Sequence, residues 1–108
     1  MKLSYILAVF ILVVSCAAQK MPAPSQAHVD RVAKRFPTAS LAELNKGKML
    51  YEQHCGKCHK FVKPETLPEM EWLKIVPVMA QKAKIDQVAQ DYILKYTIAL
   101  SKPAESNQ

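Results

Sequence analysis

Apolar residues recur at helical spacing along several stretches of this chain, and no stretch alternates in the way that a half-buried strand requires. A short apolar face over residues 28–36 predicts a helix or turn that docks on the domain and ends before Pro37. Ser40 and Glu43 form a capping box, in which each side chain satisfies a free backbone N–H of the first turn. This box predicts a helix that runs to about Gln53.

The second half of the chain carries the patterns of two further helices. A second capping box begins at Thr66 and starts a helix that places Trp72 and Met79, seven residues apart, on one face. Asp86 can cap a last helix, which continues through about Leu100. The sequence therefore predicts an all-α fold.

The N-terminus has the pattern of an export signal. Met1-Lys2 precedes an apolar run over residues 3–14, which is shorter than the roughly 20 residues of a membrane-spanning helix. The run ends in Val13-Val14-Ser15-Cys16, which resembles the cleavage box of bacterial lipoproteins. The resemblance implies cleavage before Cys16 and a diacylglycerol on its thiol. An uncleaved short anchor and an ordinary signal peptide are the alternatives.

These patterns divide the chain into a signal, a tether, a domain and a tail. The Pro-rich, polar segment after Cys16 is typical of a linker, and a flexible stretch over 17–39 would reach roughly 25–30 Å. The predicted division is: signal peptide 1–15, extended N-terminal tether 16–39 with a possible short helix, domain 40–101 and flexible tail 102–108.

One short motif carries the chemistry of the chain. Cys55-Gly-Lys-Cys58-His59 is a C-x-x-C-H run, which in an exported protein is the attachment signature of a c-type haem. Thiols three residues apart lie on one side of a helical turn and can each bond one vinyl group of the same porphyrin. His59 is then placed to bind the iron.

Two other uses of the same cysteines remain open. A disulfide between Cys55 and Cys58 usually belongs to a strand–helix–strand context, which is not seen here. A zinc site of Cys55, Cys58, His59 and His54 would take all its ligands from one short run, whereas structural zinc sites usually join two separated pairs. One covalent haem c is the cofactor that the motif and the export signal favour. If Cys16 is acylated, no odd thiol is left over.

The net charge of +6 suggests the kind of partner. Many of the lysines lie near the motif: Lys46, Lys48, Lys57, Lys60 and Lys63. They can form a solvated surface, a collar that steers acidic redox proteins, or a contact for anionic lipid headgroups. Nucleic acid is not expected as a partner in an extracytoplasmic compartment.

Residues 40–101 resemble class I cytochrome c domains, in the short bacterial branch with one haem. The matching residues are Gly47-Lys-Met-Leu-Tyr51, the C-x-x-C-H run, Glu71-Trp72, Met79 and the helix from Tyr92 to Leu100. The resemblance implies three main helices around the haem, with Gly47 and Tyr51 crossing against Tyr92, Leu94 and Tyr96. It would also explain Gly47, since a glycine inside a helix costs about 1 kcal/mol relative to alanine.

The resemblance also implies a methionine as the second axial ligand of the iron. Met79 is the first candidate, because a Trp precedes the distal Met by seven residues in that branch, as Trp72 does here. Met70, His28 and an open sixth position are the alternatives. Trp72 is expected to pack on the porphyrin or beneath Met79, with its N–H directed at a propionate.

The expected function is single-electron transfer by a membrane-tethered, monomeric mono-haem cytochrome c. Its partners would be acidic redox proteins, and its place would be the periplasmic side of the inner or outer membrane in a bacterial cell envelope. The sequence holds no recognisable catalytic set beside the motif, so an enzyme is not expected. A gas-binding haem protein with a labile sixth ligand, or a haem subunit of a larger oxidoreductase, are the alternatives.

Overall fold

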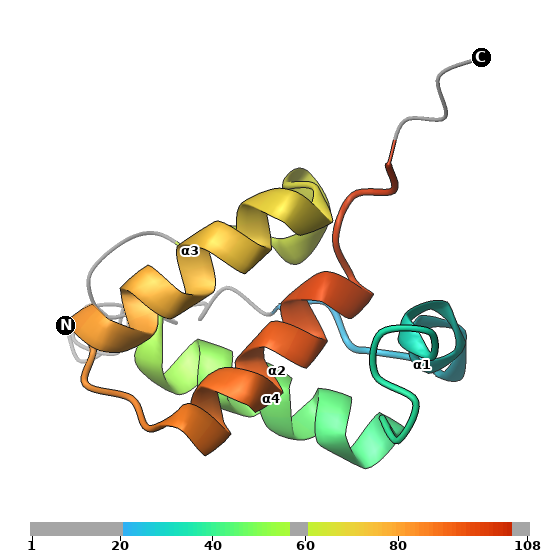
Figure 1. Ribbon diagram of the computed structural model, residues 1–108, viewed down its shortest axis with the longest axis horizontal. Helices are drawn as coiled ribbons and strands as arrows, with labels where there is room; N and C mark the ends of the chain where they lie inside the picture. The colour runs from blue at the N-terminus through green and yellow to red at the C-terminus, as the bar shows by residue number, and fades with distance from the viewer. Residues whose placement is uncertain (1–20, 57–60, 105–108) are drawn as a thin grey trace, which may run out of the picture.

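The computed structural model describes residues 21–56 and 61–104, which fold into four α-helices and one short 3-10 helix (Figure 1). The described part of the chain contains no strand, apart from an isolated bridge between Pro68 and Lys102. The prediction of an all-α fold is therefore confirmed. The helices are α1 (Gln26–Val32), α2 (Leu41–His54), η2 (Pro64–Thr66), α3 (Glu69–Lys82) and α4 (Gln87–Ala99).

Two of the predicted helix starts are correct in detail. At the start of α2, the Glu43 N–H donates to Ser40 Oγ at 3.2 Å, and the Ser40 N–H donates to Glu43 Oε2 at 3.1 Å. At the start of α4, the Ala89 N–H donates to Asp86 Oδ1 at 2.8 Å. Each bond satisfies a donor that the first helical turn leaves free.

The predicted capping box at Thr66 is wrong. Thr66 closes the 3-10 helix η2, and its hydroxyl donates backward to the Lys63 carbonyl at 2.7 Å. The chain is extended at Leu67 and at Pro68, which is the residue that caps α3. Because the chain is extended over these two residues, α3 begins too far along the chain for Thr66 to be its N-cap.

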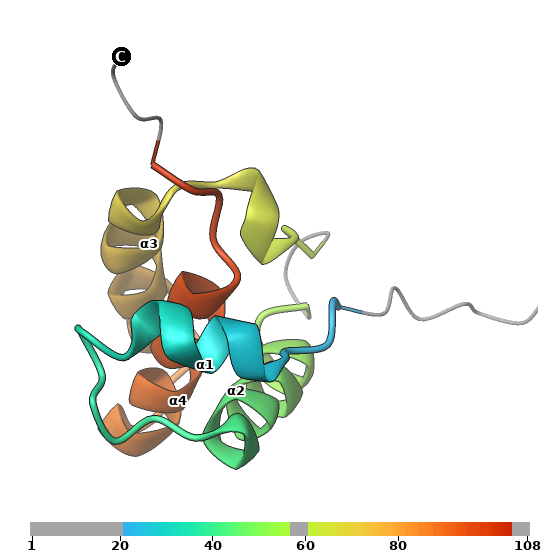
Figure 2. The ribbon, with the colours of Figure 1, turned by 90° about the vertical axis from the view of Figure 1, so that its right-hand side faces the viewer.

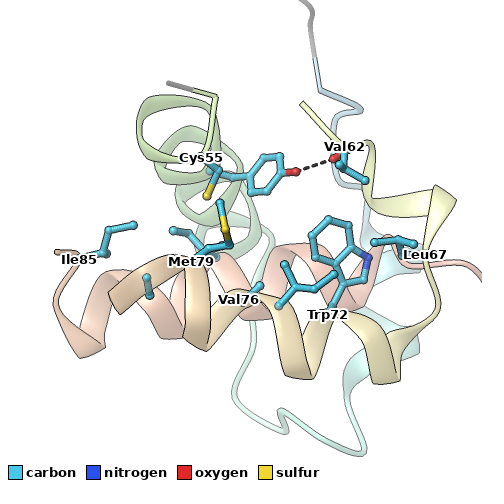
Figure 3. A pocket seen from close by; sticks show the side chains of 11 residues that line it. Cys55, Val62, Leu67, Trp72, Val76, Met79 and Ile85 are labelled. Carbon is cyan, nitrogen blue, oxygen red and sulfur yellow. Dashed lines mark hydrogen bonds between the residues drawn. The ribbon is translucent and has the colours of Figure 1, made fainter. Parts of the chain in front are cut away.

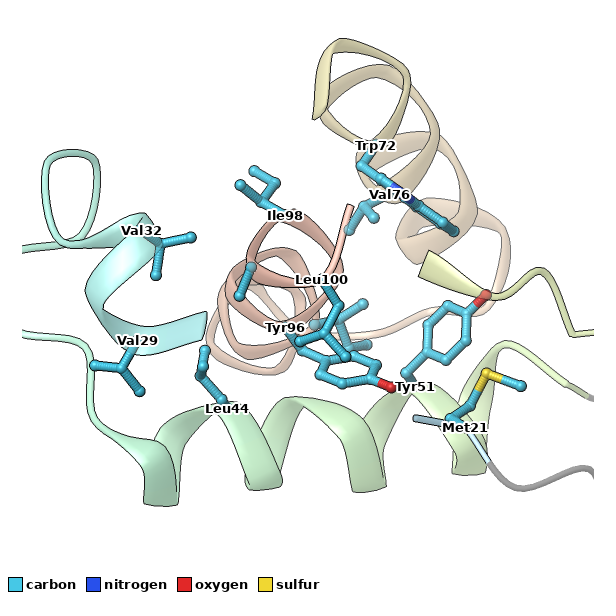
Figure 4. Packing of buried hydrophobic residues seen from close by; sticks show 12 residues of the cluster. Met21, Val29, Val32, Leu44, Tyr51, Trp72, Val76, Tyr96, Ile98 and Leu100 are labelled. Carbon is cyan, nitrogen blue, oxygen red and sulfur yellow. The ribbon is translucent and has the colours of Figure 1, made fainter. Parts of the chain in front are cut away.

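The helices α2 and α4 cross at Gly47. A β-carbon built on Gly47 would lie 2.1 Å from the Tyr92 carbonyl oxygen and 2.7 Å from Tyr96 Cβ. Leu44 and Tyr96 are fully buried at this crossing (Figure 4). The close approach that the sequence predicts at Gly47 is therefore confirmed, and α3 packs on the same α4 from another side.

The segment before α2 is docked on the domain (Figure 2). Met21 is only 3% exposed, and it joins Val29 and Val32 in the main hydrophobic cluster. The segment 16–39 is predicted as an extended tether, whereas its described part, from Met21 onward, packs against other elements. The expected short helix is present as α1, and it begins before residue 28.

Hydrogen bonds from distant parts of the chain hold this docked segment. Tyr96 in α4 donates its hydroxyl to the Pro22 carbonyl at 2.7 Å. Arg31 in α1 donates to the carbonyl oxygens of Ser101 at 2.7 Å and Ala99 at 3.2 Å, just where α4 ends. The arginine satisfies carbonyls that the end of a helix leaves without a partner.

A left-handed residue ends α3. Lys84 has a φ of 55°, and the Ile85 N–H reaches back to the Ala80 carbonyl at 2.9 Å. With the Lys84 N–H bonded to the Gln81 carbonyl at 3.2 Å, this is a Schellman motif. It turns the chain sharply and brings Ile85 back beside Ala80.

Among the described helices, none combines the length and the apolar character that a membrane crossing needs.

We predict that Gly47→Ala destabilises the domain by about 2 kcal/mol, because the new methyl overlaps a backbone carbonyl that cannot rotate away. The free energy of unfolding, measured by urea titration, would show the loss. Lys46→Ala is the matched control, since Lys46 is an exposed neighbour in the same helix and should change stability by less than about 0.5 kcal/mol. Equal stability of the two variants would contradict the tight crossing.

Candidate functional site

A pocket with an empty volume of about 690 Å³ opens between α2, α3 and α4 (Figure 3). Its lining is almost entirely apolar and comprises Tyr51, Cys55, Val62, Leu67, Trp72, Ile75, Val76, Met79, Ala80, Ile85 and Ile93. The Schellman turn supplies two of these residues, Ala80 and Ile85.

Cys55 lines the pocket from the C-terminal end of α2. Burial raises the pKa of its thiol to about 11, because the charged form would lose its hydration. The thiol therefore stays protonated at neutral pH. Three predicted site residues, Cys58, His59 and Cys16, lie outside the described residues.

Met79 lines the same pocket from α3 and is half-buried. In Figure 3 its side chain extends toward Cys55, with Trp72 farther along the same helix. Met70 is 60% exposed and does not line the pocket. The structure thus brings Met79, and not Met70, to the cysteine.

His28 lies on α1, where its ring takes part in capping that helix. The Ser25 N–H donates to His28 Nδ1 at 2.9 Å, and neither His28 nor His54 lines the pocket. Across residues 21–56 and 61–104, no three His, Cys, Asp or Glu side chains gather into a metal-binding group.

Trp72 forms part of the buried pocket wall and is 2% exposed. Its indole N–H donates to the Pro64 carbonyl at 2.9 Å, in a buried hydrogen bond. The sequence predicts that this N–H is directed at a haem propionate. In the structure, the single donor of the indole is instead bonded within the protein.

Tyr51 also lines the pocket, and it holds the segment that contains Val62. Its hydroxyl donates to the Val62 carbonyl at 2.5 Å, and its ring lies 5.8 Å from Phe61 and 6.1 Å from Trp72 between centroids. Burial raises the pKa of this phenol further, so the hydroxyl remains a donor. Sequence reasoning placed Tyr51 only in the helix crossing. Its position one turn before Cys55 is the signal that could have connected it to the site.

Tyr51 and Trp72 together anchor the segment that follows the C-x-x-C-H motif. Val62 and Pro64 each receive one of these hydrogen bonds, from two different helices. Within the motif itself, a β-carbon built on Gly56 would lie 2.0 Å from the Phe61 ring. The segment that follows the motif is therefore fixed by contacts within the protein.

The chemistry of this pocket fits a covalently held haem. The lining is apolar, as the porphyrin faces require, and it presents one thiol and one thioether. Haem iron in cytochromes c is commonly held by His and Met, and the thioether of Met79 would be available in this pocket as the second of these donors. Together with the C-x-x-C-H run, this pocket defines a c-type cytochrome domain.

Comparison with known proteins identifies the family. Residues 51–108, more than half of the chain, match the family described as dihaem cytochrome c (DHC). The chain belongs to the dihaem cytochrome c family, and it is a haem-based electron-transfer domain. A search of the curated proteins and a search of the solved structures each found no match. The prediction of a c-type cytochrome is confirmed, while the family found is not the class I branch with a single haem.

We predict that Tyr51→Phe lowers the free energy of unfolding by about 1 kcal/mol, because the ring contacts remain and only the hydrogen bond to Val62 is lost. Urea unfolding of the haem-loaded protein measures this change.

Tyr92→Phe is the matched control for this prediction. The Tyr92 hydroxyl makes no hydrogen bond within the part of the chain that the structure describes, so its loss should leave stability nearly unchanged. If both variants unfold like the parent, Tyr51 does not anchor the segment after the motif.

Proposed function

We propose that this chain is a lipid-anchored electron carrier with one covalent haem per 108-residue chain. Cys55 and Cys58 form the thioether bonds, His59 is the proximal ligand and Met79 is the distal ligand. The observation that carries the proposal is that Cys55 and Met79 line one apolar pocket from two different helices. A ligand pair of His and Met favours reversible electron transfer at a raised potential.

The proposal of a single haem rests on the cysteines of this sequence. C-x-x-C-H occurs once in the 108 residues, at Cys55. The one remaining cysteine, Cys16, has no second cysteine or histidine at the required spacing. The family's description speaks of two haems, but these residues supply thiols for the covalent attachment of one.

The choice of Met79 as distal ligand rests on its position and its surroundings. Its thioether lies in the pocket between apolar residues of α3 and α4, where water has few polar groups to bind. Met70, the alternative on the same helix, is held at the surface. A six-coordinate iron leaves no open position for a substrate, so the proposed role is electron transfer without catalysis.

The partners are proposed from charge. Lys46 is exposed, and the whole chain carries a net charge of +6. We infer acidic redox proteins as partners, approached at a rate that falls as salt increases. The lipoprotein-like box at Cys16 supports an acyl anchor and a location on the periplasmic face of a bacterial membrane.

We predict that the protein, produced with c-type maturation machinery, gains the mass of one haem. Intact-mass spectrometry and a pyridine haemochrome spectrum, referred to protein concentration, give the number of haems per chain. Cys58→Ser should leave at most one thioether bond, which the haemochrome spectrum distinguishes. A mass increase of two haems would refute the proposed stoichiometry.

We predict that Met79→Ala removes the sixth ligand, with Met70→Ala as the matched control on the same helix. The oxidised spectrum of the first variant should lose its methionine–iron signature, and its reduced form should bind carbon monoxide rapidly and fully. The reduction potential should also fall, because Met/His ligation raises it. An oxidised spectrum of Met79→Ala identical to that of the parent would exclude Met79.

A further inference from the structure

The docked N-terminal segment leaves the domain at a fixed point. Met21 is buried in the main hydrophobic cluster, and the Pro22 carbonyl accepts the Tyr96 hydroxyl at 2.7 Å. Farther along the segment, Arg31 is bonded to two carbonyl oxygens at the end of α4. The segment from Met21 onward is therefore held by the domain and is not a free linker.

This exit point lies beside the haem-attachment side of the domain. The rings of Tyr96, which holds Pro22, and Tyr51, which holds Val62, are 6.1 Å apart between centroids. Figure 4 shows Met21 next to Tyr51, and Figure 2 shows the described start of the segment on the side away from the turn after α1. Two tyrosines in ring contact thus hold Pro22, next to Met21, and Val62, after the motif.

The remaining length of chain is short. Five residue steps separate Cys16 from Met21 in the sequence, which at full extension span at most about 18 Å. A flexible chain of this length covers on average only about 12 Å. A lipid on Cys16 would consequently hold Met21 close to the headgroups, whatever the conformation of these residues.

Two neighbours of the exit point have side chains suited to a membrane surface. Val62 is 43% exposed, and Lys63 after it is exposed as well. An exposed aliphatic side chain can enter the headgroup layer, and a lysine is attracted to an anionic surface. Lys20 precedes Met21 in the sequence and adds a further positive charge.

We propose that the face around Met21, Val62 and Lys63 rests on an anionic lipid surface, so that the domain is oriented on the membrane with its haem-attachment side toward the bilayer. The inference rests on the proposed acylation of Cys16. It goes beyond that proposal by assigning an orientation and a contact face. An electron partner must then be reached within the plane of the same membrane, near its surface.

The test uses the full-length acylated holoprotein in nanodiscs that contain phosphatidylglycerol and a gadolinium-chelating lipid. Amide NMR signals of the reduced protein report which residues approach the gadolinium. We expect loss of the signals of Met21, Val62 and Lys63, and retention of those of Lys34, after α1, and Val88, at the start of α4. In Figure 2 these last two segments lie on the side away from the exit point.

Two variants serve as controls. A 20-residue Gly/Ser insertion between Gln19 and Lys20 should give weak, even signal loss, because it lets the domain reorient. Lys63→Gln should reduce the loss at Val62 while leaving attachment to the nanodisc intact.

The outcomes separate the two proposals. If the acylated parent protein shows signal loss as even as the insertion variant does, the proposed orientation is wrong and the anchor is unaffected. The same holds if its strongest signal loss is at Lys34 or Val88. Mass spectrometry that finds no acyl chain on Cys16 overturns both the anchor and the orientation.

Discussion

The close approach of α2 and α4 at Gly47 is the constraint on which the other features depend. With no β-carbon at this position, the two helix backbones meet at the Tyr92 carbonyl, and the rings of Tyr51 and Tyr96 come to lie side by side. Each of these tyrosines then uses its hydroxyl to hold a different segment, the N-terminal one at Pro22 and the post-motif one at Val62. The absence of a side chain at Gly47 thus allows the packing that positions both Val62 at the pocket and Pro22 in the N-terminal segment.

Local patterns predicted the helices well, because a cap depends on residues three apart. The capping box at Ser40 and the side-chain cap at Asp86 form as expected. The box at Thr66 does not form, since a 3-10 turn and two extended residues separate Thr66 from the start of α3. The docking of residues 28–36 was expected from their apolar face. That of Met21 and Pro22 was not predicted, because it depends on bonds such as Tyr96 to Pro22, which join residues 74 positions apart. Polar, proline-rich composition describes a segment alone and carries no information about a distant partner.

The sequence also predicted some, but not all, features of the candidate site. The C-x-x-C-H run indicated the cofactor, and the helical spacing of Trp72 and Met79 placed both on the helix that faces Cys55. Periodicity alone did not give the role of the indole N–H, which is bonded to Pro64, nor that of the Tyr51 hydroxyl. These two donors reach backbone carbonyls, and a carbonyl has no signature in a sequence because every residue carries one.

The hydrogen bonds to Val62 and Pro64 have a consequence for the polar groups of the cofactor. The Tyr51 hydroxyl and the Trp72 indole N–H are both used as donors within the protein. Neither donor is then available to a haem carboxylate. These two aromatic residues would thus meet the porphyrin through apolar contact, and the propionates would take their hydrogen-bond donors from elsewhere on the domain.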